Sequence, residues 1–153
     1  FEDYSMNNKT YRYFTGTPLY GFGYGLSYTT FKYDALKVTP KAKKDSELSV
    51  TVRITNTGKL EGEEVPQLYV MNQDSGIKTP LKSLKGFERI HLKAKESKTI
   101  TFKLLPEDLS YVTSDGTLKP FNGKIKIAIG GCQPDEKNKT SANVVTQTIQ
   151  IVN

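Results

Sequence analysis

The chain has 153 residues, of which 36% are hydrophobic and 25% charged, so it is long enough to bury a core without disulfides or a metal ion, and we expect one domain. No apolar run approaches the roughly 18 residues that a membrane-spanning helix needs, and the single Cys132 excludes an internal disulfide framework. The net charge of +6 does not indicate nucleic acid, because the lysines alternate with apolar residues in strand-like runs. We therefore expect neither a nucleic-acid partner nor a membrane span.

The chain opens with a segment rich in aromatic residues and glycine, residues 10–31, which reads TYRYFTGTPLYGFGYGLSYTTF. Eleven of the sixteen aromatic residues lie within residues 1–33, which is more apolar surface than one edge of a domain needs. The pattern is too irregular for a helix and too apolar for a solvated linker, and it predicts an extended arm that lies on another surface. We predict an arm over residues 1–30 and a folded domain over residues 31–153.

Seven segments after the arm have the composition and spacing of β-strands. The clearest is 46–57, in which apolar residues at every second position from Leu48 to Ile54 predict one buried and one solvated face. The segment 63–72 is apolar on both faces near its middle, which predicts a more deeply buried strand. Residues 106–109, PEDL, predict a single helical turn. The predicted strands cover residues 31–39, 46–57, 63–72, 84–92, 97–105, 124–130 and 144–152.

Short strands separated by turns rich in Gly, Pro, Asn and Asp, with no long amphipathic helix, predict an all-β fold. We expect an immunoglobulin-like or fibronectin type III-like antiparallel β-sandwich of about seven strands, with the arm at its N-terminus. The sequence has no tryptophan and no second cysteine. This favours the fibronectin type III kind of sandwich over the antibody kind.

The sequence offers no set of side chains in an arrangement typical of catalysis or metal binding. His91 is the only histidine, which predicts an exposed or half-buried strand residue, and Cys132 has no nearby base to activate it. The carboxylates of residues 61–64 and 107–108 lie in polar turns, where they are ordinarily solvated rather than held across a pocket. The glycines of GFGYG indicate close backbone packing, not a phosphate-binding loop. We predict no catalytic residue, no metal site and no cofactor.

The aromatic arm remains as the candidate functional segment, with two interpretations. We favour burial of its side chains against a neighbouring domain, because of the amount of apolar surface. Alternatively, tyrosines such as Tyr11, Tyr13, Tyr20 and Tyr24 stack on the rings of a carbohydrate. An exposed arm would also make the isolated chain self-associate. The predicted docking residues are Tyr11, Tyr13, Phe14, Leu19, Tyr20, Phe22, Tyr24, Leu26 and Tyr28.

Residues 18–31, PLYGFGYGLSYTTF, resemble the segment that joins the catalytic part of family 3 glycoside hydrolases to their C-terminal fibronectin type III-like domain, where the usual form is close to PLYPFGYGLSYTTF. The resemblance continues through NTG at residues 56–58, EGEEVPQLY at 61–69, LKGF at 84–87 and GG at 130–131, so it covers essentially the whole chain. Gly21 departs from the family's proline and loosens the arm locally.

The resemblance implies a non-catalytic accessory domain that docks on the catalytic domains of a retaining β-glucosidase or β-xylosidase, which we call the parent chain. Residues 10–14, TYRYF, are similar to the β-xylosidase form. In this family the nucleophilic aspartate lies in a (β/α)8 barrel and the acid/base lies outside the terminal domain, so no catalytic residue carries over.

The first residues, FEDY, have neither an initiator Met nor the pattern of a secretory signal. We therefore expect a piece of a longer chain, with a periplasmic or secreted parent rather than a cytoplasmic one. A free-standing adhesion domain is the disfavoured alternative, because it gives the aromatic arm no surface to cover.

Overall fold

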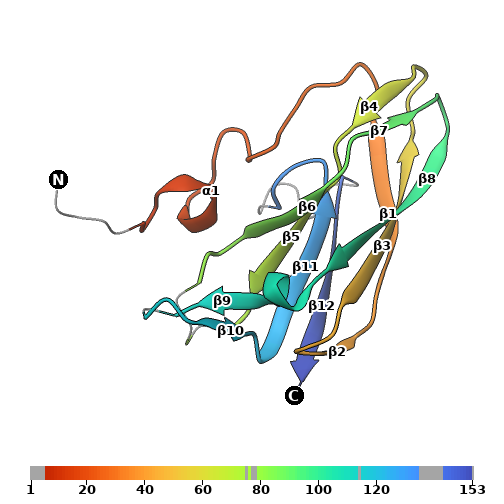
Figure 1. The fold of residues 1–153 in the computed structure, drawn as a ribbon. Helices are drawn as coiled ribbons and strands as arrows, with labels where there is room; N and C mark the ends of the chain where they lie inside the picture. The colour runs from red at the N-terminus through yellow and green to blue at the C-terminus, as the bar shows by residue number, and fades with distance from the viewer. Residues whose placement is uncertain (1–5, 75, 77–78, 114, 135–142, 153) are drawn as a thin grey trace.

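The computed structural model describes residues 6–74, 76, 79–113, 115–134 and 143–152, and its two main β-sheets pack face to face (Figure 1). This confirms the predicted all-β sandwich. The elements in chain order are α1 (Thr10–Tyr13), β1 (Phe31–Val38), β2 (Lys41–Lys43), β3 (Leu48–Asn56), β4 (Gly62–Glu64), β5 (Gln67–Asn72), β6 (Ser83–Phe87), β7 (Ile90–Leu92), β8 (Ser97–Leu104), η1 (Pro106–Leu109), β9 (Ser110–Val112), β10 (Leu118–Pro120), β11 (Gly123–Gly130) and β12 (Val144–Val152).

The two main sheets differ in size. One has three strands in the order β1-β3-β8, and the other has five in the order β2-β12-β11-β5-β6. The strand pairs of these sheets are antiparallel, except that β2 runs parallel to β12. Two short ribbons, β4 with β7 and β9 with β10, extend from opposite ends of the sandwich (Figure 1).

The alternation of apolar and polar residues decides which face of each strand is buried. In β3 the apolar positions from Leu48 to Ile54 are buried, as predicted, and the residues between them are exposed or half-buried. Strand β1 shifts its register against β3 between Asp34 and Lys37, where Ala35 has a φ of +50°. This irregularity lets the strand keep apolar residues facing the core on both sides of the shift.

The main core lies between the sheets. Val52 of β3 and Ile127 of β11, from opposite sheets, have no exposed surface and belong to one continuous cluster. Full burial of an aliphatic side chain of this size contributes about 1.5–3 kcal/mol to folding. A core of this kind needs no disulfide or metal ion, in keeping with the composition of the chain.

A second, smaller cluster lies on the other face of the five-stranded sheet. Tyr69, Met71, Ala128 and Val144 form it, and Tyr11 of the arm packs against it. Because residues 67–71 are all buried, β5 has no solvated face. The prediction of a deeply buried strand here is confirmed, and the arm supplies part of its cover.

All seven predicted strands are present, but two of them are divided. The segment 63–72 breaks at Val65-Pro66 into β4 and β5, since proline has no amide to donate to a ladder. The segment 84–92 breaks between Phe87 and Ile90 into β6 and β7. The predicted helical turn is the 3-10 helix η1, whereas the four-residue helix α1 in the arm was not predicted. Within the described residues, no helix is long and apolar enough to cross a membrane.

Candidate docking surface

The described part of the arm, residues 6–30, is held to the sandwich by its backbone. Four of its carbonyl groups accept hydrogen bonds from residues of the sandwich side: Arg12 from the Leu81 amide at 2.7 Å, Phe22 from the Gln133 amide at 2.8 Å, Gly23 from the Gln67 side chain at 3.2 Å, and Thr30 from the Thr57 amide at 2.8 Å. The path of the arm is therefore fixed at points separated along its length.

Aromatic packing adds to these hydrogen bonds. The ring of Tyr11 stacks on Phe22 with centroids 4.2 Å apart and meets the edge of Tyr69 at 6.4 Å. Burial raises the pKa of Tyr69 above its ordinary value. Tyr11, which the sequence predicts as a docking residue, is thus half-buried within this chain.

Gly23 is a point of close approach between arm and sheet. It has a φ of +77°, and a Cβ at this position would overlap the side chain of Gln67. Gln67 itself is buried, donates to the carbonyl of Gly131 at 3.1 Å and accepts from the hydroxyl of Tyr69 at 2.6 Å. The prediction of close packing is confirmed at Gly23 but not at Gly25, which has nothing within 4 Å of its Cβ position.

Most of the other large apolar side chains of the arm are exposed. Seven of the nine predicted docking residues are exposed, and Tyr11 and Tyr13 are half-buried. The most exposed are Leu19 at 83%, Tyr20 at 66%, Leu26 at 91% and Tyr28 at 97%. The rings of Tyr20 and Tyr24 contact each other with centroids 5.0 Å apart. The arm therefore presents a row of apolar side chains on a backbone that is fixed to the domain.

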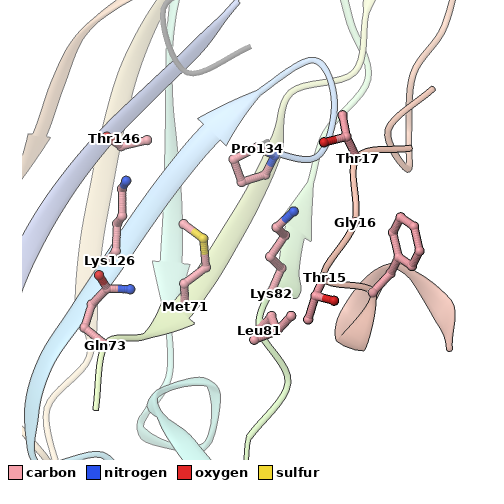
Figure 2. Close-up of a pocket in the computed structure, with 11 residues that line it drawn as sticks. Thr15, Gly16, Thr17, Met71, Gln73, Leu81, Lys82, Lys126, Pro134 and Thr146 are labelled. Atoms are coloured by element: carbon pink, nitrogen blue, oxygen red, sulfur yellow. The ribbon is translucent and has the colours of Figure 1, made fainter. Parts of the chain in front are cut away.

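A cavity of about 380 Å³ lies between the arm and the five-stranded sheet. Figure 2 shows Thr15 and Thr17 on the arm side, Lys126 and Thr146 on the sheet side, and Lys82 between them. Among the described residues the lining contains two lysines and no carboxylate. The cavity therefore combines apolar walls, such as Met71 and Leu81, with two basic side chains, and it offers hydrogen-bond donors rather than an acid/base pair.

Two of the three glutamates that follow the first turn are paired with cations across the β4–β7 ribbon. Glu61 lies 3.4 Å from Nε2 of His91, and Glu63 forms an ion pair with Arg89. All four side chains are about half exposed or more. The interpretation of these carboxylates as solvated, and of His91 as an exposed strand residue, is confirmed.

That interpretation is wrong for Glu64. Its side chain points to the opposite face of β4, is half-buried and accepts a 2.8 Å hydrogen bond from the hydroxyl of Tyr33. Burial raises the pKa of the Glu64 carboxyl, although the Tyr33 hydroxyl and the Val65 amide act in the other direction. Burial and the Glu64 charge also raise the pKa of Tyr33. The alternation of faces along a strand is the signal that could have separated Glu64 from Glu63.

Known proteins match most of this chain. Residues 64–133 match the fibronectin type III-like domain family. A xylan 1,4-β-xylosidase from Xylanibacter ruminicola is 44% identical over 142 residues, which cover 91% of this chain and 16% of that protein. A periplasmic β-glucosidase from Salmonella typhimurium is 41% identical over 127 residues, which cover 81% of this chain and 18% of that protein. The chain thus spans less than a fifth of these two relatives.

Solved structures agree with this relationship. A β-glucosidase from Listeria innocua in complex with gluconolactone superposes with a TM-score of 0.79 at 29% identity, over 95% of this chain and 20% of that chain. A β-glucosidase from Erythrobacter marinus superposes with a TM-score of 0.78 at 34% identity, over 89% of this chain and 17% of that chain. Residues 64–133 therefore match a fibronectin type III-like domain, and the chain is similar to one part of β-xylosidases and β-glucosidases, among them a GH3 β-glucosidase from Bifidobacterium adolescentis.

Proposed function

We propose that this chain is a non-catalytic accessory domain that docks on the catalytic domains of a β-glucosidase or β-xylosidase and stabilises them. The observation that carries this proposal is the arm, whose backbone is bound to the sandwich while Leu26 and Tyr28 are almost fully exposed. We also propose the division into an arm of residues 1–30 and a sandwich of residues 31–153. The nine arm residues named above form the docking surface.

The physical argument is one of preorganisation. Contiguous apolar side chains on a soluble domain usually mark an interaction site, and covering a side chain such as Leu26 stabilises a complex by about 1.5–3 kcal/mol at most. Because the arm is already fixed by Arg12, Phe22 and Gly23, docking orders little additional backbone.

The catalytic part of the parent chain is the partner we propose. The relatives are named as β-xylosidases and β-glucosidases, and this chain corresponds to less than a fifth of the two compared above. Most of such a protein therefore lies outside this chain. Hydrolysis of β-glucosides or β-xylosides would be performed there.

The test compares variants in the full-length parent and in the isolated chain. Leu26→Ser combined with Tyr28→Ser should lower the unfolding midpoint of the parent by several degrees, and leave the isolated chain within about one degree, because the interface exists only in the parent. Val112→Ser is the matched control, since Val112 is 62% exposed and lies on β9, at the other end of the sandwich from the β4–β7 ribbon (Figure 1). Equal effects in the parent and the isolated chain would count against docking.

Carbohydrate binding by the arm tyrosines is the alternative function. Tyr20 and Tyr24 are exposed, but their rings contact each other. The ring of Tyr11 already packs against Phe22 and Tyr69. Flat, free ring faces, which stacking on a sugar requires, are therefore less available than the sequence suggests. Calorimetric titration of the chain with xylo- and gluco-oligosaccharides separates the two functions. Saturable binding that is lost in Tyr20→Ala and Tyr24→Ala would favour the alternative.

A further inference from the structure

A second cavity, of about 310 Å³, lies where the arm joins the sandwich. One wall is the arm segment from Tyr24 to Ser27, and the other includes Tyr33 of β1, Glu64 of β4 and Cys132, which follows β11. The carboxylate of Glu64 lies so close to Gly131 that a Cβ on that glycine would overlap Oε1. Glu64 is thus a carboxylate held in place within a cavity.

Among the residues that the structure describes, Glu64 differs from Glu61 and Glu63 in having no cation beside it. Glu61 and Glu63 face His91 and Arg89 across the ribbon, whereas no lysine, arginine or histidine nitrogen of the described residues lies within ion-pair distance of Glu64. The titratable groups that line the cavity with it are Tyr24, Tyr33 and Cys132. None of these carries a positive charge, so the cavity presents a partly desolvated negative charge.

The lining of this cavity shares residues with the proposed docking surface. Tyr24 and Leu26 line the cavity and are also exposed, at 51% and 91%. A neighbour that covers these two side chains therefore also covers the cavity and removes the remaining water around Glu64. A carboxylate buried in this way is stable as an anion only when it is paired.

We propose that the catalytic part of the parent chain places a cationic side chain in this cavity, where it forms an ion pair with the carboxylate of Glu64. A guanidinium group fits best, because its planar donors match a carboxylate and it is weakly hydrated. The inference rests on the proposed docking function, and it adds the chemistry of the partner's contact.

The test measures undocking in the full-length parent. Hydroxyl-radical footprinting along a urea series reports the urea concentration at which Leu26 and Tyr28 become reactive, and hence the equilibrium constant for undocking. Glu64→Gln keeps an oxygen that can accept from Tyr33 but removes the charge, and it should raise that constant at least tenfold at pH 7. Glu63→Gln, on the same strand and exposed, should change it less than twofold.

The pH dependence gives a second readout. If Glu64 docks as an anion beside a cation, undocking should become easier as pH falls through the carboxyl range, and this dependence should be absent in Glu64→Gln. Burial and the Glu64 charge raise the pKa of Tyr33, so this hydroxyl keeps its proton throughout the carboxyl range. Docking that strengthens as pH falls would instead mean that Glu64 is buried as a neutral acid, which would overturn the inference.

The two proposals fail differently. If Glu64→Gln undocks like the wild type while Leu26→Ser weakens docking, the ion pair is wrong and docking through the arm still holds. If Leu26 and Tyr28 are as reactive in the wild-type parent as in the isolated chain, both proposals are wrong. Loss of fold in Glu64→Gln is recognised from the unfolding midpoint of the isolated chain, which should not fall.

Discussion

The hydroxyl of Thr29, at the end of the arm, donates a 2.6 Å hydrogen bond to Oδ1 of the fully buried Asn56. The same oxygen accepts from the Gly58 amide at 3.0 Å, and Nδ2 of Asn56 donates to the carbonyls of Leu60 and Leu92. One side chain therefore joins the arm, the turn after β3 and the end of β7. It fixes the place from which the arm leaves the sandwich.

Asn56→Ala should destabilise the isolated chain by about 2–4 kcal/mol, because it leaves several buried polar groups without partners. Chemical denaturation measures this directly. Asn122→Ala, at an exposed asparagine, should stay within about 0.5 kcal/mol of the wild type. A similarly small effect at Asn56 would show that the network does not contribute to stability.

Gly23→Ala and Gly25→Ala form a matched pair within the arm. Alanine at Gly23 meets both a φ of +77° and the side chain of Gln67, whereas Gly25 has open space around it. Gly23→Ala should therefore lower the free energy of unfolding by about 1–3 kcal/mol, and it should speed amide hydrogen exchange in residues 20–25. Gly25→Ala should leave both quantities unchanged. Equal behaviour of the two variants would mean that the arm is not held at Gly23.

Glu64 should make the isolated chain less stable as pH rises. Its pKa is raised in the folded state, so the folded chain binds the proton more tightly than the unfolded chain does. The stabilisation that tighter proton binding at Glu64 gives the folded chain is fully present below the unfolded pKa, and it is lost as pH rises through the folded pKa. Glu64→Gln should therefore gain stability over the wild type as pH rises from the unfolded pKa through the folded pKa, as denaturation at several pH values would reveal. A difference that shrinks with rising pH would contradict the assignment.

Exposed arm residues should make the isolated chain dimerise as its concentration increases. Sedimentation should show this association, and Leu26→Ser with Tyr28→Ser should reduce it while Val112→Ser does not. A monomer across a wide concentration range would exclude self-association through the arm. Such a result would not contradict the proposal that the arm docks on the catalytic part of the parent chain.

The sequence predicts the sandwich well, because alternation in strands such as β3 and β11 reflects a local rule about faces. It also identifies the arm, because apolar side chains that follow neither a strand nor a helix periodicity indicate contact with another surface. It does not predict the roles of Asn56, Gln67 and Glu64. Asn56 looks like a turn residue and Glu64 like its solvated neighbours, because their hydrogen bonds to Thr29 and Tyr33 join residues far apart in the sequence.

The docking of the arm can be tested most directly by hydroxyl-radical footprinting of the isolated chain and the full-length parent under identical conditions. Leu26 and Tyr28 should react rapidly in the isolated chain, where they are 91% and 97% exposed, and should be strongly protected in the parent. Val112 and Leu118 of the β9–β10 ribbon should react equally in both. Unchanged reactivity of Leu26 and Tyr28 in the parent would contradict the proposal that the arm is the surface by which this domain binds its catalytic neighbour.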